Sequence, residues 1–146
     1  MCHHGLLQQA RRGRAFLDVA RALVGGASEA YWRAVMLHAY NALFLECRDA
    51  QGRWGFPVPP HHNVHPTVRL RFVYATDPDL NRIGKELDWL IQLRNRASYN
   101  LNPAAVFASA TEAQRSIRKA TDALALLDTI EADPARLAAA RAAIRP

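Results

Sequence analysis

Hydrophobic residues recur every three or four positions over most of this chain, which is the spacing of one face of an α-helix. The pattern predicts four long helices, one short helix and a tail helix. The long helices are expected at about residues 5–24, 28–49, 79–101 and 104–131, the short helix at 66–75, and the tail helix after Asp133-Pro134. The expected fold class is therefore all-α, a bundle of four long antiparallel helices with a short helix and a C-terminal tail helix.

Helix-breaking residues and capping residues mark the ends of these helices. Gly25-Gly26 are expected to stop the first helix, and Ser28 is a typical N-cap for the second. The stretch from Gly52 to Pro66 holds four prolines and two glycines, which exclude a regular element over most of it. We expect a loop there, folded over the bundle near the 79–101 helix, so that its aromatic and histidine side chains contact a ligand or partner.

The chain has 146 residues, half of them hydrophobic, which is enough for one core. We expect a single domain over residues 1–146, with its core at about 5–131 and a tail at 132–146. No run of about 18 uncharged apolar residues occurs, so neither a membrane span nor a signal peptide is expected. The two cysteines show no spacing typical of disulfides or zinc, which favours a cytoplasmic location.

The charge balance is basic, with 19 Lys and Arg against 13 Asp and Glu, a formal net charge of +6. A basic surface makes nucleic acid a plausible partner. The excess is spread along the chain rather than gathered in one block, so an ordinary solvated surface remains the alternative.

One arginine interrupts the most regular hydrophobic pattern in the chain. Arg94 stands in the stripe formed by Leu80, Ile83, Leu87, Leu90, Ala97 and Leu101. An unpaired guanidinium inside an apolar stripe costs several kcal/mol. Arg94 is therefore expected to pair with a carboxylate such as Glu46 or Asp18, to bond backbone carbonyls, or to face a cleft or a second subunit.

Three segments carry a resemblance to a known family. They are AYWRAVMLHAYNALFLE (Ala30 to Glu46), HPTVRLRF (His65 to Phe72) and LDWLIQLRNRASYNL (Leu87 to Leu101). In this order the segments resemble the HEPN domain, a helical nucleotide-binding domain of prokaryotes and higher eukaryotes. The resemblance implies an all-α bundle that pairs as a two-fold homodimer. In nuclease members, an Arg-polar-x-x-x-His motif from each copy lines the dimer cleft and cuts RNA without a metal ion.

The motif is incomplete in this chain. Arg94-Asn95 match its first two positions, but Tyr99 stands where a histidine is expected. A tyrosine, with its pKa near 10, is a poor general base at neutral pH. The resemblance thus implies Arg94, Asn95 and Tyr99 as a candidate catalytic set. The candidate RNA- or nucleotide-binding residues are Arg94, Arg96, His38 and His65, because these histidines could also reach a cleft beside the arginines.

The histidines have competing interpretations. The position of His38 on an apolar helix favours a core histidine with its hydrogen bonds satisfied, although it could also reach a cleft. His61, His62 and His65 lie in or at the end of the predicted loop, and their spacing is only a weak metal-ligand pattern. No glycine-rich phosphate motif occurs, so neither a metal nor a nucleotide cofactor is expected.

The leading functional hypothesis is a HEPN-like module that binds RNA or nucleotide around Arg94, Asn95 and Tyr99 without cutting it. The resemblance implies a homodimer in a toxin–antitoxin or defence setting, with a possible protein partner such as a nucleotidyltransferase. Two alternatives remain open. One is a metal-independent endoribonuclease that uses Arg94-Asn95 with Tyr99 or a loop histidine, and the other is a purely structural interaction bundle.

Overall fold

The described part of the chain is built from helices. The computed structural model describes residues 12–60, 62–100 and 107–145, and every regular element among them is helical. These elements are α2 (Arg14–Leu23), α3 (Glu29–Arg53), α4 (Val64–Val73), α5 (Pro78–Tyr99), α6 (Thr111–Ala132) and α7 (Pro134–Ala142). The prediction of an all-α bundle is confirmed.

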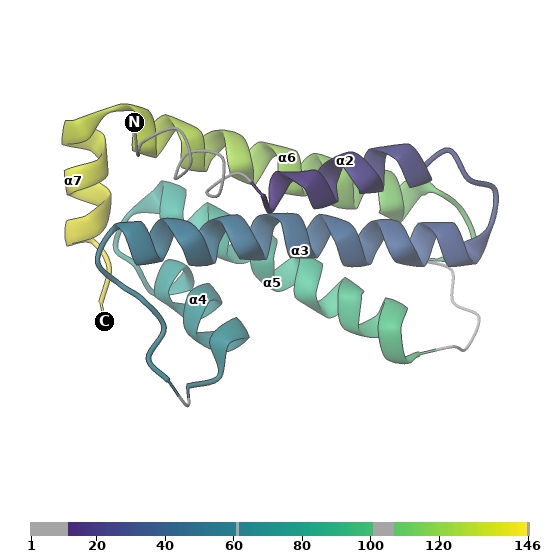
Figure 1. Ribbon diagram of the computed structural model, residues 1–146, viewed down its shortest axis with the longest axis horizontal. Helices are drawn as coiled ribbons and strands as arrows, with labels where there is room; N and C mark the ends of the chain where they lie inside the picture. Colours follow the sequence, from purple (N-terminus) through teal and green to yellow (C-terminus); the bar gives the residue numbers. More distant parts are fainter. Residues whose placement is uncertain (1–11, 61, 101–106, 146) are drawn as a thin grey trace.

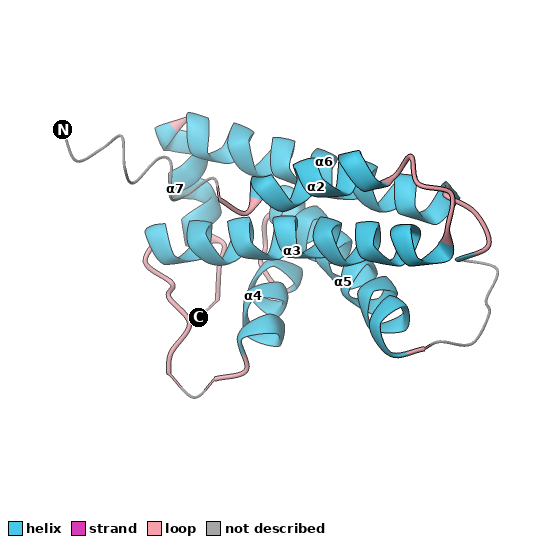
Figure 2. Ribbon diagram, turned by 45° about the vertical axis from the view of Figure 1, so that its right-hand side comes forward, coloured by secondary structure: helices cyan, strands magenta, loops and turns pink. Residues whose placement is uncertain are grey.

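Helix α3 is the centre of the bundle. It packs against α2, α4, α5 and α6, and Figure 1 shows it crossing the molecule with α2 and α6 on one side and α4 and α5 on the other. A short turn reverses the chain between α2 and α3, and α5 runs antiparallel to α3. Helix α7 lies across the end of the bundle, as Figure 2 also shows. This arrangement brings the middle of α3 beside both α4 and α5.

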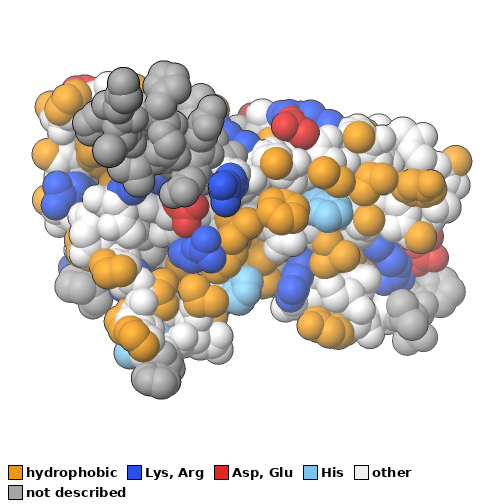
Figure 3. Space-filling model, viewed as in Figure 1, with side chains coloured by type: hydrophobic (Ala, Val, Ile, Leu, Met, Phe, Trp, Pro, Cys, Tyr) orange, Lys and Arg blue, Asp and Glu red, His pale blue; other side chains and the backbone are white. Residues whose placement is uncertain are grey.

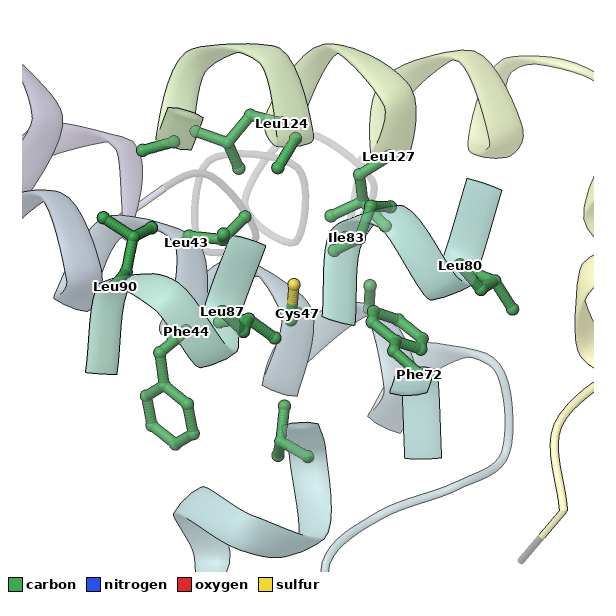
Figure 4. Packing of buried hydrophobic residues seen from close by; sticks show 14 of the residues in the cluster. Leu43, Phe44, Cys47, Phe72, Leu80, Ile83, Leu87, Leu90, Leu124 and Leu127 are labelled. Carbon is green, nitrogen blue, oxygen red and sulfur yellow. The ribbon is translucent and has the colours of Figure 1, made fainter. Parts of the chain in front are cut away.

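Apolar side chains from four helices form the main core. Figure 4 shows Leu43 of α3, Phe72 of α4, Leu87 of α5 and Leu127 of α6 meeting there. All four are essentially inaccessible to solvent, and a fully buried side chain of this size contributes about 1.5–3 kcal/mol. A second, smaller cluster lies toward the N-terminal end of α3 and includes Met36 and Phe107.

Side-chain oxygens cap the N-terminal ends of three helices. The Ser28 hydroxyl accepts a hydrogen bond from the Tyr31 N–H at 3.4 Å. Asp77 accepts from the first N–H groups of α5, and Asp133 accepts from the Ala135 N–H of α7. Each oxygen satisfies a helix N–H that has no partner within its own helix. The predicted break at Asp133-Pro134 is confirmed.

Helix α3 is longer than predicted, because it ends at Arg53 rather than near residue 49. Gly55 provides the stop, with φ +96°. Its N–H bonds the Gly52 carbonyl, and the Phe56 N–H bonds the Gln51 carbonyl, which together form a Schellman motif. The extra turn is retained because it buries Ala50 and Gln51.

Three other helix starts differ from the prediction. Helix α4 begins at Val64, so His65 lies in its first turn and not in the loop. Helix α6 begins at Thr111 rather than 104, because residues 107–110 form a 3₁₀ turn and bends in which the Ser109 hydroxyl accepts from the Thr111 N–H. Helix α2 begins at Arg14 after a turn at residues 12–13. The predicted helical residues 5–11, 101 and 104–106 lie outside the described residues.

The proline-rich loop between α3 and α4 is held against α4. The Arg71 guanidinium donates hydrogen bonds to the carbonyls of Phe56 and Pro57. Trp54 is buried, and its indole N–H donates to Glu131 of α6. The loop therefore lines a pocket with the outer side of α4, and its Phe56 and Val58 side chains pack against the main core.

Over the described ranges, no helix combines the length and the apolar character that a membrane span requires.

Candidate anion-binding site

Arg94 carries a guanidinium that the protein leaves unpaired. The side chain is half-buried on α5, and its Nη1 donates to the Asn95 side-chain oxygen at 3.2 Å. Its Nε is buried and has no hydrogen-bond partner. Glu46 and Asp18, the carboxylates considered for it, pair with arginines of α2 instead. Within the described residues, Arg94 forms no salt bridge.

The side chains next to Arg94 come from helices α3 and α4. Its guanidinium carbon lies 5.9 Å from the centre of the Tyr40 ring on α3. The Tyr40 hydroxyl lies 2.6 Å from Nδ1 of His65 on α4, and the His65 ring stacks on Phe44 with centroids 4.1 Å apart. Three helices therefore bring an arginine, a tyrosine and a histidine together.

A fourth member of this group is Arg69. It lies one helical turn after His65 on α4, so both side chains project from the same side of that helix. Its charge acts on Tyr40 together with that of Arg94. Its ion pair with Asp88 is long, at 3.7 Å. We call Arg94, Tyr40, His65 and Arg69 the Arg94 cluster.

Burial controls the protonation of the two rings. It raises the pKa of Tyr40 to about 12, although the nearby arginines act in the opposite direction. Burial, and then the charge of Arg94, lower the pKa of His65 below its ordinary 6.5. At pH 7 the tyrosine hydroxyl therefore keeps its proton and the imidazole is neutral.

These protonation states define what the cluster offers to a ligand. The Tyr40 O–H has no other acceptor among the described residues, so it donates to His65 Nδ1 and places the ring proton on Nε2. His65 is half-buried, and its Nε2 forms no hydrogen bond with the described residues. The site thus presents an N–H donor beside two guanidinium groups, of which Arg69 also forms a long ion pair with Asp88, and this chemistry fits an anion such as phosphate.

The other candidate residues lie elsewhere. Asn95 is exposed and touches the cluster only through Arg94, and the Tyr99 side chain is 77% exposed at the end of α5. Arg96 faces a different side of α5. It lines a pocket of about 560 Å³ together with Trp89, Gln92, Leu93, Ser109, Thr111 and Glu112. Of the candidates, Arg94 and His65 both lie beside Tyr40, and Asn95 is bonded to Arg94.

His38 is not a core histidine with satisfied hydrogen bonds. It is half-buried, its ring stacks on Phe16 at 5.8 Å, and its buried Nδ1 has no partner. Figure 3 shows the face over α3, where histidine and Lys/Arg side chains lie among hydrophobic ones. His61 lies outside the described residues, His62 lines the loop pocket, and the described residues contain no group of three His, Cys, Asp or Glu that could hold a metal ion.

Sequence reasoning overlooked the most buried arginine, Arg33, which is 9% exposed. Its Nη1 donates to the carbonyls of Arg96, Ala97 and Asn100, at the C-terminal end of α5. The rest of its guanidinium pairs with Glu29, and its charge lies 3.9 Å above the Phe107 ring. The spacing Glu29-x-x-x-Arg33 was the one available signal of this pair.

Comparison with known proteins identifies no relative: no family model matches the chain, and neither a curated protein nor a solved structure matches it significantly.

Proposed function

We propose that this chain is a HEPN-like module that binds RNA or a nucleotide without cutting it, and that the Arg94 cluster binds the phosphate. One observation carries the proposal: Arg94 is half-buried, its Nε is buried without a partner, and it lies beside a neutral histidine rather than a carboxylate. A protein tolerates such a cation where the group faces a wet site and is matched by a ligand's charge.

The hydrogen bonding of His65 favours binding over cleavage. Metal-free cleavage of RNA needs a base to accept the 2′-hydroxyl proton. The Nδ1 lone pair of His65 accepts from Tyr40, and Nε2 then carries the ring proton, so the nitrogen that has no partner among the described residues is a donor. Tyr40, with its pKa raised to about 12, is not a base at pH 7 either. With His65 neutral and the Tyr40 hydroxyl protonated, the cluster therefore offers donors and positive charge to a phosphate but no base for cleavage.

A metal-independent endoribonuclease is the second candidate, and one observation favours it. His65 is held neutral next to Arg94, which is the protonation state a general base requires. If a substrate displaced the Tyr40 hydrogen bond, the opposite tautomer would expose a lone pair. A cleavage assay separates this candidate from the first.

The experiment compares two arginines of α5. Arg82 is exposed, lies three turns before Arg94 and has no ion pair among the described residues. Binding of a fluorescein-labelled single-stranded oligoadenylate is measured by anisotropy in EDTA for the wild type, Arg94→Leu and Arg82→Leu. We expect Arg94→Leu to weaken binding at least tenfold. The salt slope, which is the slope of the logarithm of the binding constant against the logarithm of the salt concentration, should fall by about one, as for the loss of one phosphate contact. Arg82→Leu should change little in either quantity.

Equal affinities for Arg94→Leu and Arg82→Leu would contradict the proposal. The same samples are run on a denaturing gel. Cleavage in EDTA that disappears in Arg94→Leu favours the ribonuclease instead.

The homodimer implied by the HEPN resemblance is tested separately by light scattering at micromolar concentration, where the mass of a single chain would contradict it.

A further inference from the structure

A second pocket lies on the opposite side of α4 from the Arg94 cluster. Its volume is about 680 Å³. Helix α4, the loop before it and the C-terminal segment enclose it, and the lining residues are Pro59, His62, Thr67, Leu70, Arg71, Tyr74 and Arg145. None of these residues is acidic.

The floor of this pocket is apolar and contains an exposed aromatic ring. The Tyr74 side chain is 67% exposed at the end of α4, and Leu70 lies one turn before it. No aromatic or cationic contact to Tyr74 occurs among the described residues. Exposed apolar groups that share one pocket are typical of a surface that a ligand covers.

The wall of the pocket is fixed by the protein itself. Arg71 donates to the carbonyls of Phe56 and Pro57 and to the Gln51 side chain, which holds the loop in place. Both terminal nitrogens of the Arg71 guanidinium therefore donate to the protein. Arg71 contributes positive charge to the pocket without being free to rearrange around a ligand.

Arg145 is a second cation of the pocket, without an ion pair among the described residues. Ile144 is buried in the main core, and the Ala143 carbonyl accepts from the Thr76 N–H at 3.0 Å, so the backbone on its N-terminal side is anchored. The Arg145 side chain is exposed and forms no ion pair with the described residues. The pocket thus combines a bare ring with one available guanidinium.

We propose that this pocket binds a base of single-stranded RNA, stacked on Tyr74, with the adjoining phosphate on Arg145. The inference rests on the proposed function, because it extends the path of the same RNA strand. Base stacking on exposed aromatic rings beside basic groups is a general mode of single-strand binding. A peptide helix would need apolar anchors over two or more turns, whereas the pocket offers only Leu70 and Tyr74 as large exposed apolar side chains.

The two sites are close enough for one strand. His65 and Arg69 project from one side of α4, and Leu70 and Tyr74 from another. At 1.5 Å per residue, the levels of His65 and Tyr74 differ by roughly 14 Å along the helix. Because the two sites lie on opposite sides of α4, a strand of several nucleotides that passes around this helix is long enough to join the Arg94 cluster to the pocket.

The test uses the labelled oligoadenylate and four further variants. Tyr74→Ala is expected to weaken binding about tenfold with an unchanged salt slope, because it removes stacking and no charge. Tyr74→Phe keeps the ring and is expected to bind within about twofold of the wild type. Arg145→Gln is expected to weaken binding and to lower the salt slope by about one. Tyr31→Ala, which removes another exposed tyrosine, is the matched control.

The outcomes separate this inference from the proposed function. If Tyr74→Ala binds like Tyr31→Ala while Arg94→Leu is weakened, the pocket proposal is overturned and the proposed function stands. If Arg94→Leu also binds normally, both are overturned. Titration with AMP, followed by NMR, is expected to shift the amides of Tyr74 and Arg145. Shifts with an acidic amphipathic peptide but none with AMP would overturn the inference in favour of a protein partner.

Discussion

Two arginines on apolar helix faces, Arg33 and Arg94, have opposite surroundings. Arg33 is buried, and its guanidinium is bonded to Glu29 and to three carbonyls at the end of α5. Arg94 is half-buried, bonds only the Asn95 side chain, and has a buried Nε with no partner. One guanidinium is satisfied by the protein, and the other is not.

This difference separates a structural cation from a candidate ligand-binding one. Arg33 donates to carbonyls at the C-terminal end of α5, where the last carbonyls of a helix have no N–H donor in a following turn, and it shares the Arg96 carbonyl with the Asn100 N–H. A cation at that end also interacts favourably with the helix dipole. Arg94 performs neither task for the described residues. Its surroundings, a neutral histidine and a second arginine, favour an anion from outside the fold.

The largest expected effect concerns the stability of the two leucine variants. Arg33→Leu removes the donor of three carbonyls and the partner of Glu29, so we expect the free energy of unfolding to fall by about 3 kcal/mol. Arg94→Leu removes a cation that forms no salt bridge with the described residues and bonds the exposed Asn95 side chain, so its free energy of unfolding is expected to stay unchanged or to rise by up to about 1 kcal/mol. Urea denaturation monitored by circular dichroism measures both.

Arg82→Leu serves as the control in the same experiment, because it removes an exposed arginine. A loss for Arg94→Leu as large as that for Arg33→Leu would show that Arg94 is a structural residue after all.

A smaller effect is expected on the titration of His65. Burial comes first and the charge of Arg94 second among the causes that lower its pKa. Arg94→Leu removes the second cause, so the pKa of His65 should rise toward 6.5 without reaching it, while Arg82→Leu should leave it unchanged. NMR titration of the imidazole protons measures this. An identical pKa in the wild type and Arg94→Leu would place Arg94 away from His65.

The sign of the accompanying stability change follows from linkage. Between the folded-state pKa and 6.5, the unfolded chain binds more protons than the folded one, so stability rises with pH. The contribution of the neutral ring is complete above pH 6.5 and is lost as the pH falls through the folded-state pKa. Phosphate binding should depend on pH in the opposite direction. A protonated His65 ring attracts an anion, so RNA affinity should increase as the pH falls, while the stability of the folded chain decreases.

Much of the fold could be predicted because it depends on local signals. The hydrophobic spacing located every described helix, and Ser28 and Asp133 marked helix ends through hydrogen bonds to neighbouring residues. The errors arose where contacts between residues far apart in the sequence determine where a helix ends. Helix α3 continues through Gly52 because Gln51 is buried and donates to the Val68 carbonyl, and no local pattern shows that contact.

The candidate site was less predictable for the same reason. Periodicity placed Arg94 in the apolar stripe of α5, where the structure shows it half-buried. It could not show that Tyr40 and His65 meet, because 25 residues separate them. It also could not show that the protein satisfies the hydrogen bonds of Arg33 and not those of Arg94, because the carbonyl acceptors of Arg33 lie more than 60 residues away in sequence. Burial of a charge depends on partners that only the folded chain brings together.

The smallest expected effects concern Asn95 and Tyr99, the two motif residues that the structure leaves outside the cluster. Asn95 is exposed and touches only Arg94, and Tyr99 is 77% exposed at the helix end. Exposed substitutions without buried partners usually change stability by less than about 0.5 kcal/mol. We therefore expect Asn95→Ala and Tyr99→Phe to bind the oligoadenylate within about threefold of the wild type, measured by anisotropy beside Arg94→Leu. A loss for Tyr99→Phe comparable to that of Arg94→Leu would mean that its hydroxyl contacts RNA directly. The binding surface would then continue along α5 as the family motif implies, and the contrast between Arg94 and its sequence neighbours would disappear.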